Sequence, residues 1–564
     1  MSFPQLDESD RVQISHLSQA TATLVERKDD LEAKLRQLEQ EIGRNQAQLA
    51  ALHNKASFAC NLPTEILCHI LKAAHSAVYR SRAQPLSMII PPEVACSLVC
   101  TGWRTAILSM PQLWSTFHCI NPSLTILESE NERLQVYLDR SKDHDLEFVF
   151  RFKQLGGTHQ HTLLQRLLNA TLPHVARWKK LSLASDGEDG VAIGFHQPLR
   201  TLHAPRLEYL DVRTRKYHDF HNLGWDSEPD WNPKLFHRQN PPSLRYLRLD
   251  ISAALARYRP RFGNFVHVSL EAGPVLSMLG RGSATLTFLC FIEILRQPTI
   301  ETISLWGDMF ASIDLDLMED LEAPRLKHFR IGNCWQISPL EFLLGRVKAP
   351  RLETITIQNV WFPFSGGLPQ LRIGDTNDYI FPAFRELHLT DGMMRLRSGE
   401  LLQETERHPL HYLARRTRNA RRLTLAMRSI RDHKNILMAL HMKNGVVWKG
   451  PGDDRMANDA PFDLALCPDA EEVTLVALPS MTDNTYLNSL GSFWPRVKKV
   501  IVPESYYVPP EWTSSGVQLE RIGRTSPLGI NSWPPGYSEA TWRNDVDARD
   551  DDPFFLQEKE AASL

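Results

Sequence analysis

The sequence APRLKHFRI at residues 323–331 returns 26 residues later as APRLETITI at residues 349–357. Each copy starts with a small residue and a proline and continues as apolar-x-x-apolar-x-apolar. The alternation in the second half of each copy is the side-chain period of a β-strand with one face on a core. A similar string begins at Ile300, again 26 residues before Leu326. The spacing predicts a repeated unit made of one short strand and a return segment.

Further copies of this pattern occur at less regular spacing from about Leu146 to Pro503. They lie at residues 178–183, 204–212, 242–249, 300–305, 384–389, 421–425, 470–475 and 497–502. A period in this range is typical of leucine-rich repeats. We therefore expect residues 145–505 to form a divergent, leucine-rich-repeat-like solenoid with parallel strands on its concave face. A β-rich domain of unrelated strands is the alternative. Residues 506–564 are interpreted as a capping extension with a disordered acidic tail.

An apolar heptad runs through residues 14–53 without a proline. Nine of its twelve a and d positions are apolar, and Lys28 and Asn45 are its polar breaks. Its g and e positions carry pairs of opposite charge, as a parallel coiled coil prefers. These pairs are Arg27 with Glu32 and Lys34 with Glu39. We expect a coiled-coil helix that can associate with a second copy, and a disordered segment at residues 1–13. A lone amphipathic helix folded onto the rest of the chain is the alternative.

Residues 58–119 predict three short helices. The first begins at NLPTE, residues 61–65, with a proline in the first turn and an acid near the positive end of the helix dipole. A polar link rich in proline precedes a second helix that carries Val94, Leu98, Val99, Trp103 and Ile107. Three short helices bury little core by themselves, which favours an interaction module. A small helical subdomain packed on its own chain is the alternative.

The strings LPTEIL at 62–67, LVCTGWR at 98–104 and PQLW at 111–114 resemble an F-box. More narrowly, a coiled coil, an F-box and divergent repeats in this order resemble the large F-box families of mushroom-forming fungi. The resemblance implies that residues 58–119 dock the Skp adaptor of a cullin-RING ubiquitin ligase. The adaptor-binding residues it implies are Leu62, Pro63, Ile66, Leu67, Ile70 and Leu71. The residues it assigns to packing of the module are Leu98, Val99, Trp103, Leu113 and Trp114. The polar link at about 72–91 is longer than in compact F-boxes.

The expected fold is thus mixed α and β, with an N-terminal coiled-coil helix, a small three-helix F-box and an irregular α/β solenoid. The chain has 64 Lys and Arg against 66 Asp and Glu. This balance argues against nucleic acid or an anionic membrane as a general partner. Eight cysteines without a CxxC pair do not indicate a disulfide framework. No signal peptide or membrane span is expected, and the predicted location is cytoplasmic and/or nuclear.

The sequence contains no convincing catalytic constellation. A phosphate-binding GxxxxGK[ST] loop, an HExxH motif and a GxSxG elbow are all missing from it. Cys96 and Cys100 share a helix face, but zinc would need two more ligands at similar spacing, so packing is the better interpretation. The short Gly280-Arg281-Gly282 string lacks the third glycine of a dinucleotide-binding loop. We expect no enzyme activity, no cofactor and no metal.

Two features are candidates for recognition of a target protein. One is the pair Trp225 and Trp231 in an insertion between strings. The other is an arginine run with Arg415, Arg416 and Arg418, because guanidinium groups suit carboxylates and phosphates. Solvated side chains are the alternative for both. The sequence favours a non-catalytic substrate receptor of an SCF-type ubiquitin ligase, with the Skp adaptor, a cullin-RING ligase and an unidentified target as partners. A coiled-coil and repeat scaffold without a ligase role is the alternative.

Overall fold

The computed structural model describes residues 7–80, 90–120, 122–152, 158–185, 203–214, 241–250, 263–272, 288–310, 319–334, 338–360, 381–390, 413–414, 416–427, 467–477, 494, 496–503 and 516–522. These residues divide into two compact units. The first holds the described residues up to Val78 together with Ile90–Leu113, and the second holds Tyr79, Arg80 and the described residues from Trp114 onward. Trp225, Trp231, Arg415 and the tail after residue 522 lie outside the described residues, and so do residues 81–89 of the polar link.

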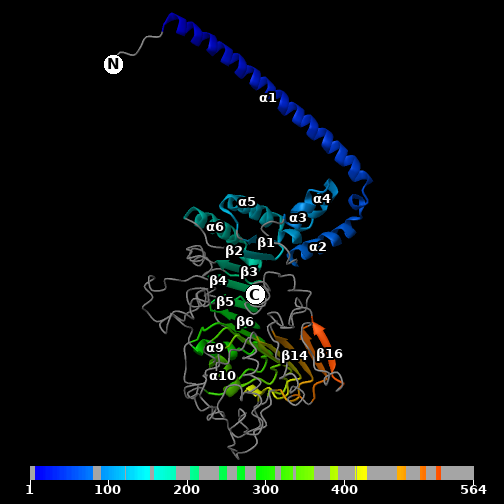
Figure 1. Ribbon diagram of the computed structural model, residues 1–564, viewed down its shortest axis with the longest axis vertical. Helices are drawn as coiled ribbons and strands as arrows, with labels where there is room; N and C mark the ends of the chain where they lie inside the picture. The colour runs from blue at the N-terminus through cyan, green and yellow to red at the C-terminus, as the bar shows by residue number, and fades with distance from the viewer. Residues whose placement is uncertain are drawn as a thin grey trace, which may run out of the picture. The chain divides into compact units, whose positions relative to one another are not determined.

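The first unit begins with helix α1, which runs for 49 residues from Glu8 to Ala56 (Figure 1). Asp7 caps its N-terminus, since its side chain accepts a hydrogen bond from the Ser9 amide at 3.3 Å. The long N-terminal helix predicted from the heptad is confirmed. It starts earlier than the first seam residue, Ile14, because the polar cap at Asp7 and the acidic first turn favour a helix start there.

Short helices form the rest of the first unit. They are η1 (Ala59–Asn61), α2 (Thr64–Arg80), α3 (Pro92–Ser97), α4 (Thr101–Leu108) and η3 (Pro111–Trp114). The expected second helix is therefore two helices. Cys100 has an extended backbone, and its sulfur accepts from the Trp103 amide at 3.4 Å, so it ends one helix segment and caps the next.

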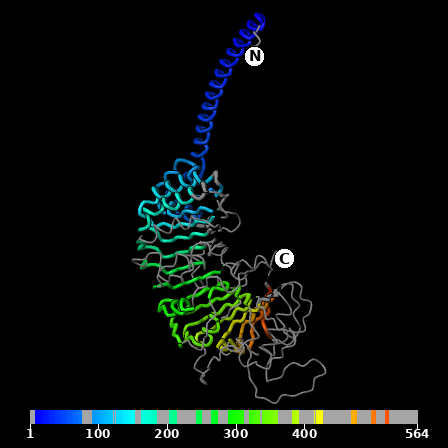
Figure 2. Tube along the Cα trace, turned by 90° about the vertical axis from the view of Figure 1, so that its left-hand side faces the viewer, coloured from blue at the N-terminus to red at the C-terminus, as the bar shows by residue number. Residues whose placement is uncertain are grey.

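The second unit is built on one large parallel sheet. Its strands are β1 (Thr116–Ile120), β2 (Leu146–Phe152), β3 (Trp178–Ser185), β4 (Tyr209–Thr214), β5 (Tyr246–Asp250), β6 (His267–Glu271), β7 (Thr302–Trp306), β9 (His328–Gly332), β11 (Thr354–Gln358), β12 (Glu386–Thr390), β13 (Arg422–Met427), β14 (Glu472–Ala477), β15 (Lys499–Pro503) and β16 (Gln518–Ile522). These fourteen strands are hydrogen-bonded in chain order. Figure 2 shows them following one another from cyan to red. The mixed α and β class is confirmed.

Helices and a second, smaller sheet accompany these strands. Helices α5 (Leu124–Arg140), α6 (Thr158–Thr171) and η4 (Leu172–Arg177) follow β1 and β2, and α5 packs on α6 and β1. Helices α9 (Phe288–Leu295) and α10 (Ser338–Arg346) precede β7 and β11. Strands β8 (Leu321–Glu322) and β10 (Val347–Lys348) pair with each other in parallel, again 26 residues apart (Leu321 with Val347).

The residues at the start of the strings form a shared turn ahead of the strands. Ala323 and Ala349 are buried, and their carbonyls accept from the amides of Leu326 and Leu352 at 3.3 and 3.1 Å. The same turn closes ahead of β4, where the Leu207 amide donates to the Ala204 carbonyl at 3.2 Å. The same turn begins at a buried Phe381 ahead of β12 and at a buried Trp494 ahead of β15, so the first position is buried in each case whatever its size.

The register of the sheet is regular through the 26-residue steps. Phe329 on β9 lies beside Ile303 on β7 and Ile355 on β11, and all three are fully buried. After these strands the backbone turns through positive φ at Gly307, Asn333 and Asn359, with values of 84°, 50° and 48°. The Asn359 amide group donates to the Asn333 side-chain oxygen at 2.8 Å. Equivalent positions in neighbouring strands therefore share both conformation and partners.

The ends of the sheet lie outside the range expected for the repeats. Strand β1 falls at the end of the segment assigned to the F-box, and β16 falls in the segment assigned to the C-terminal extension. Strand β1 lacks the string's small-residue start, and β16 is polar at alternate positions, as suits the last strand of a sheet.

Candidate docking surfaces

Helix α2 starts directly after the Leu-Pro pair. The Pro63 carbonyl accepts the first helical hydrogen bond, from the Leu67 amide at 3.0 Å, and Pro63 itself is exposed. Glu65 stands in the first turn, where the helix dipole favours an acid. Leu62 is half-buried beside it. The Leu-Pro start thus forms an accessible edge of the first unit.

The apolar residues of α2 form two adjacent rows with different surroundings. Ile66 and Ile70 are one turn apart and remain 49% and 42% exposed, while Leu67 and Leu71 are only 5% and 3% exposed. Side chains four residues apart share a helix face. Of the six expected adaptor-binding residues, two isoleucines and the proline are at the surface, and the two leucines are packed inside.

The turn between α3 and α4 adds further exposed apolar surface. Leu98 and Val99, which the sequence assigned to packing, are 65% and 46% exposed. The break at Cys100 explains this, since a continuous helix would have kept them on the stripe with Val94 and Trp103. Arg104 holds the turn, because its Nε donates to the Ser97 carbonyl at 3.0 Å.

Trp103 and His75 each connect two helical segments of the first unit. The Trp103 indole N–H donates to the Ala59 carbonyl at 3.0 Å and so joins α4 to η1. His75 of α2 lies 3.8 Å from the buried Glu93 carboxylate of α3. Burial lowers the pKa of His75 to about 4, against the opposing hydrogen bond to the Leu113 backbone. The imidazole is therefore neutral at physiological pH, and Leu113 is buried as expected.

Trp114 belongs to the second unit. Its ring is buried, meets Tyr137 edge-on with centroids 5.3 Å apart, and lies under the Arg140 guanidinium at 4.3 Å. Both partners come from α5, a helix that the sequence did not single out. The expected packing set is therefore shared between two units, with Trp103 and Leu113 in the first and Trp114 in the second.

Polar side chains line one face of the sheet and are nevertheless buried. Asp211 accepts two hydrogen bonds from Arg213, at 2.9 and 3.0 Å, and one from the Ser182 hydroxyl at 2.8 Å. Burial alone would raise the pKa of Asp211, but the charges of Arg213 and Arg248 and these hydrogen bonds outweigh it and hold that pKa below its usual value. Arg248 pairs in turn with Glu271 on β6. The charges compensate one another, which is the arrangement of a structural network.

A second row of polar residues continues along the same face. The Tyr246 ring stacks on His267 with centroids 4.6 Å apart, and His267 Nδ1 lies 2.7 Å from the Thr302 hydroxyl. Two strands further on, on β9, His328 Nδ1 lies 2.8 Å from the Thr354 hydroxyl. Burial, with help from neighbouring cations, lowers the pKa of His267 to about 3 and that of His328 to about 4. These imidazoles stay neutral and act as hydrogen-bonding spacers between strands.

The arginine run does not form one surface. Arg416 is buried, with its guanidinium 5.4 Å from the centre of the Phe381 ring. Arg418 is exposed, and Arg422 on β13 is paired with Glu386 on β12. Their proximity in the sequence suggested one shared anion-binding site, but these side chains lie in different surroundings.

Reactive chemistry is sparse in the described part of the chain. Burial raises the pKa of the Cys467 thiol to about 12, and it raises those of Cys119 and Cys334 above the usual range. Within the described ranges no three His, Cys, Asp or Glu side chains gather in a way that could hold a metal ion. No helix among the described residues has the length and apolar character that crossing a membrane requires.

The comparisons with known proteins add no name to these surfaces. Neither a protein-family model nor a curated protein matches this sequence.

Proposed function

We propose that this chain is a non-catalytic substrate receptor of an SCF-type cullin-RING ubiquitin ligase. In this role the first unit docks a Skp adaptor, and the second unit recruits a target protein. Such a receptor acts by proximity, because tethering raises the effective concentration of target lysines near the ligase. It needs no reactive side chain of its own.

The observation that carries the proposal is that α2 has one buried and one exposed row of apolar residues. Leu67 and Leu71 supply the inward packing, so the helix needs no further apolar residues for the stability of its own unit. Ile66, Ile70 and Pro63 are nonetheless apolar and exposed. Leu98 and Val99 of the same unit are also apolar and exposed. Several exposed apolar side chains in one small unit are typical of an interaction site.

We further infer that the parallel strands belong to an irregular leucine-rich-repeat-like solenoid. Three observations support this inference: strand pairing in chain order, the 26-residue steps, and the shared turn ahead of the strands. In such an array each repeat offers surface positions that can diverge without loss of the core. The target would be held by this surface, which includes Arg418 at one exposed position.

The alternative is a scaffold without a ligase role, in which α2 caps the repeats. The burial of Leu67 and Leu71 favours it, since a cap needs an inward apolar row. It gives no reason for the exposed isoleucines, however.

The test is co-purification of the full chain with a fungal Skp adaptor. We expect a one-to-one complex for the wild type. We expect at least a tenfold loss of affinity for Ile66→Glu/Ile70→Glu and for Leu62→Ala/Pro63→Ala. The matched control is Ile126→Glu on α5, where the side chain is 46% exposed. Circular dichroism establishes that each variant is folded.

Binding that survives in both α2 variants would move the adaptor site elsewhere. Failure of the folded wild type to bind would favour the scaffold.

A further inference from the structure

Helix α1 has an apolar row that no described residue of its own unit buries. None of its 49 residues is buried. The nine apolar seam residues include Leu24 and Leu31, which are 67% and 58% exposed. They are Ile14, Leu17, Leu24, Leu31, Leu35, Leu38, Ile42, Leu49 and Leu52. Helices gain most of their stability in water from packing of such a face. A helix of this length with an exposed apolar row is therefore expected to pack against another helix.

The recesses on α1 have the layout of coiled-coil holes. One recess is lined by Leu24, Arg27, Lys28, Leu31, Glu32 and Leu35. In the heptad these are successive d, g, a, d, e and a positions. In a two-stranded coiled coil, each a or d side chain enters a hole formed by four residues of the facing helix. The six residues make two overlapping holes, one for residue 28 and one for residue 31 of a facing, identical helix.

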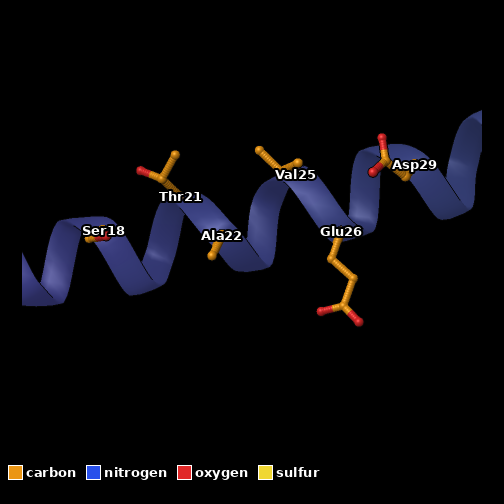
Figure 3. A pocket seen from close by; sticks show the side chains of 6 residues that line it. All are labelled: Ser18, Thr21, Ala22, Val25, Glu26 and Asp29. Atoms are coloured by element: carbon orange, nitrogen blue, oxygen red, sulfur yellow. The ribbon is translucent and has the colours of Figure 1, made fainter.

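A second recess marks the edge of this seam. It is lined by six side chains of α1 alone, and Figure 3 shows Glu26 on the opposite side of the helix from Thr21 and Val25. Thr21 is a seam position and Val25 flanks it, while Glu26 is an outer f position. Glu26 therefore marks the side of α1 that faces away from the apolar seam at this level of the helix.

We propose that α1 forms a parallel, in-register, two-stranded coiled coil with α1 of a second copy of this chain. In that arrangement Arg27 faces Glu32 of the second copy, and Lys34 faces its Glu39. Because the two helices are identical and symmetric, each of these charge pairs forms twice. The remaining g-to-e contacts join uncharged or singly charged partners, so no like charges meet there.

The antiparallel arrangement is less well matched. Full overlap of the seam in that orientation sets Leu24 opposite Ile42. It also sets Glu32 against Glu32 and Lys34 against Lys34 at the centre, and it gains only the Arg27–Glu41 pairs. Like charges across a helix interface destabilise it. The charge pattern therefore selects the parallel orientation.

Residues within the seam fix its register and its number of strands. Five of the six d positions are leucine, which favours two strands. Lys28 and Asn45 interrupt the seam, and polar seam residues set register at some cost in stability. The Lys28 ammonium lies 3.6 Å from Glu32 of its own helix, which offsets its charge. Both members of every complementary pair are present on one chain, so a second copy is the partner that fits.

This inference does not rest on the proposed function, since no residue of α2–α4 takes part. The first experiment measures the molar mass of the full chain by sedimentation. We expect a dimer for the wild type. Glu32→Lys/Glu39→Lys gives an all-positive flank, and Arg27→Glu/Lys34→Glu gives an all-negative one. Each variant alone should dimerise at least tenfold more weakly, and an equimolar mixture should restore the dimer.

The control is Glu26→Lys/Asp29→Lys, which changes net charge by the same amount as Glu32→Lys/Glu39→Lys but at outer f and b positions. It should leave the dimer intact. A monomeric wild type, a trimer, or equal weakening by the control would overturn the proposal.

Orientation is tested with single cysteines under mild oxidation, beside the wild type to account for its own thiols. In the parallel arrangement the Leu24→Cys chain crosslinks to itself. In the antiparallel arrangement it crosslinks only to an Ile42→Cys chain, and that result would refute the proposal even if the molar mass is that of a dimer.

Discussion

Helix α1 and the parallel sheet place their apolar and charged side chains in opposite environments. In α1 the leucines are exposed and every charged group is solvated. In the sheet the leucines are buried and so are charged groups such as Arg213 and Asp211. The helix takes its form from hydrogen bonds within the segment, whereas each strand of the large sheet pairs with a neighbour from a separate part of the chain. A change in α1 should therefore act on association, and a change in the sheet on folding.

The largest difference between the two regions is expected when an apolar side chain is truncated in each of them. Phe329 is fully buried, with its ring centre 6.3 Å from that of Phe291 on α9. Phe329→Ala should lower the free energy of unfolding of the second unit by about 3–5 kcal/mol. Leu31→Ala in α1 should leave that free energy unchanged and weaken only self-association. Denaturant unfolding followed by tryptophan fluorescence measures the first effect. Equal destabilisation by the two variants would contradict the contrast.

An intermediate effect is expected from a buried carboxyl group in α10. Burial raises the pKa of Glu341 from its usual 4.5 to about 7. The folded state therefore binds more protons than the unfolded state between these values, and stability falls as pH rises through this window. Glu341→Gln should remove the loss and stabilise the unit at pH 8 by roughly 1–3 kcal/mol. The measurement is the melting temperature as a function of pH.

Histidines in both units provide an internal control for that experiment. Burial lowers the pKa of His75, His267 and His328 well below 6.5. For these groups stability is present above pH 6.5 and is lost as pH falls toward 4. Glu341→Gln should leave this acid-side loss intact. A variant that keeps the fall in stability between pH 5 and 7 would show that Glu341 is not its source.

The smallest effects are expected from glycine-to-alanine substitutions, which should lower the stability of the sheet and raise that of α1. Gly307 follows β7 with φ of 84°, and an added Cβ would lie 2.8 Å from the Ala272 Cβ. Gly307→Ala should destabilise the sheet by about 1–3 kcal/mol. Gly43 lies within α1 with open space around it, so Gly43→Ala should stabilise the helix by up to about 1 kcal/mol. Ellipticity at 222 nm during thermal melting reports both changes. Two changes of the same sign would refute the distinction.

The strands were accessible from sequence because each carries its own local signal. The ten strings with small or proline starts coincide with β3, β4, β5, β7, β9 and β11–β15. Strand β6 was missed because its turn starts at Gly263-Asn264 without that signal, although Val268 and Leu270 alternate as in the other strands. The helix α5, which packs against Trp114, could have been found from its apolar positions Leu127, Leu134 and Leu138.

The candidate surfaces were less predictable, since they depend on packing between segments. The stripe of α2 gives no sign that Ile66 is exposed and Leu67 buried. Likewise, Arg416 and Arg418 look alike in sequence, yet Arg416 is buried against Phe381 and Arg418 is exposed. Burial of the polar face of the sheet depends on register between strands far apart in the chain, and no local pattern encodes it.

The chain-order pairing of the sheet has a consequence for biosynthesis. From β2 onward every described strand of the large sheet hydrogen-bonds to a strand that the ribosome has already made. The sheet can therefore grow at one edge as the polypeptide emerges, without waiting for a distant C-terminal partner, as large proteins that fold during translation require. A chain that stalls late in synthesis would carry a shorter but correctly paired sheet, with an open edge at its last completed strand.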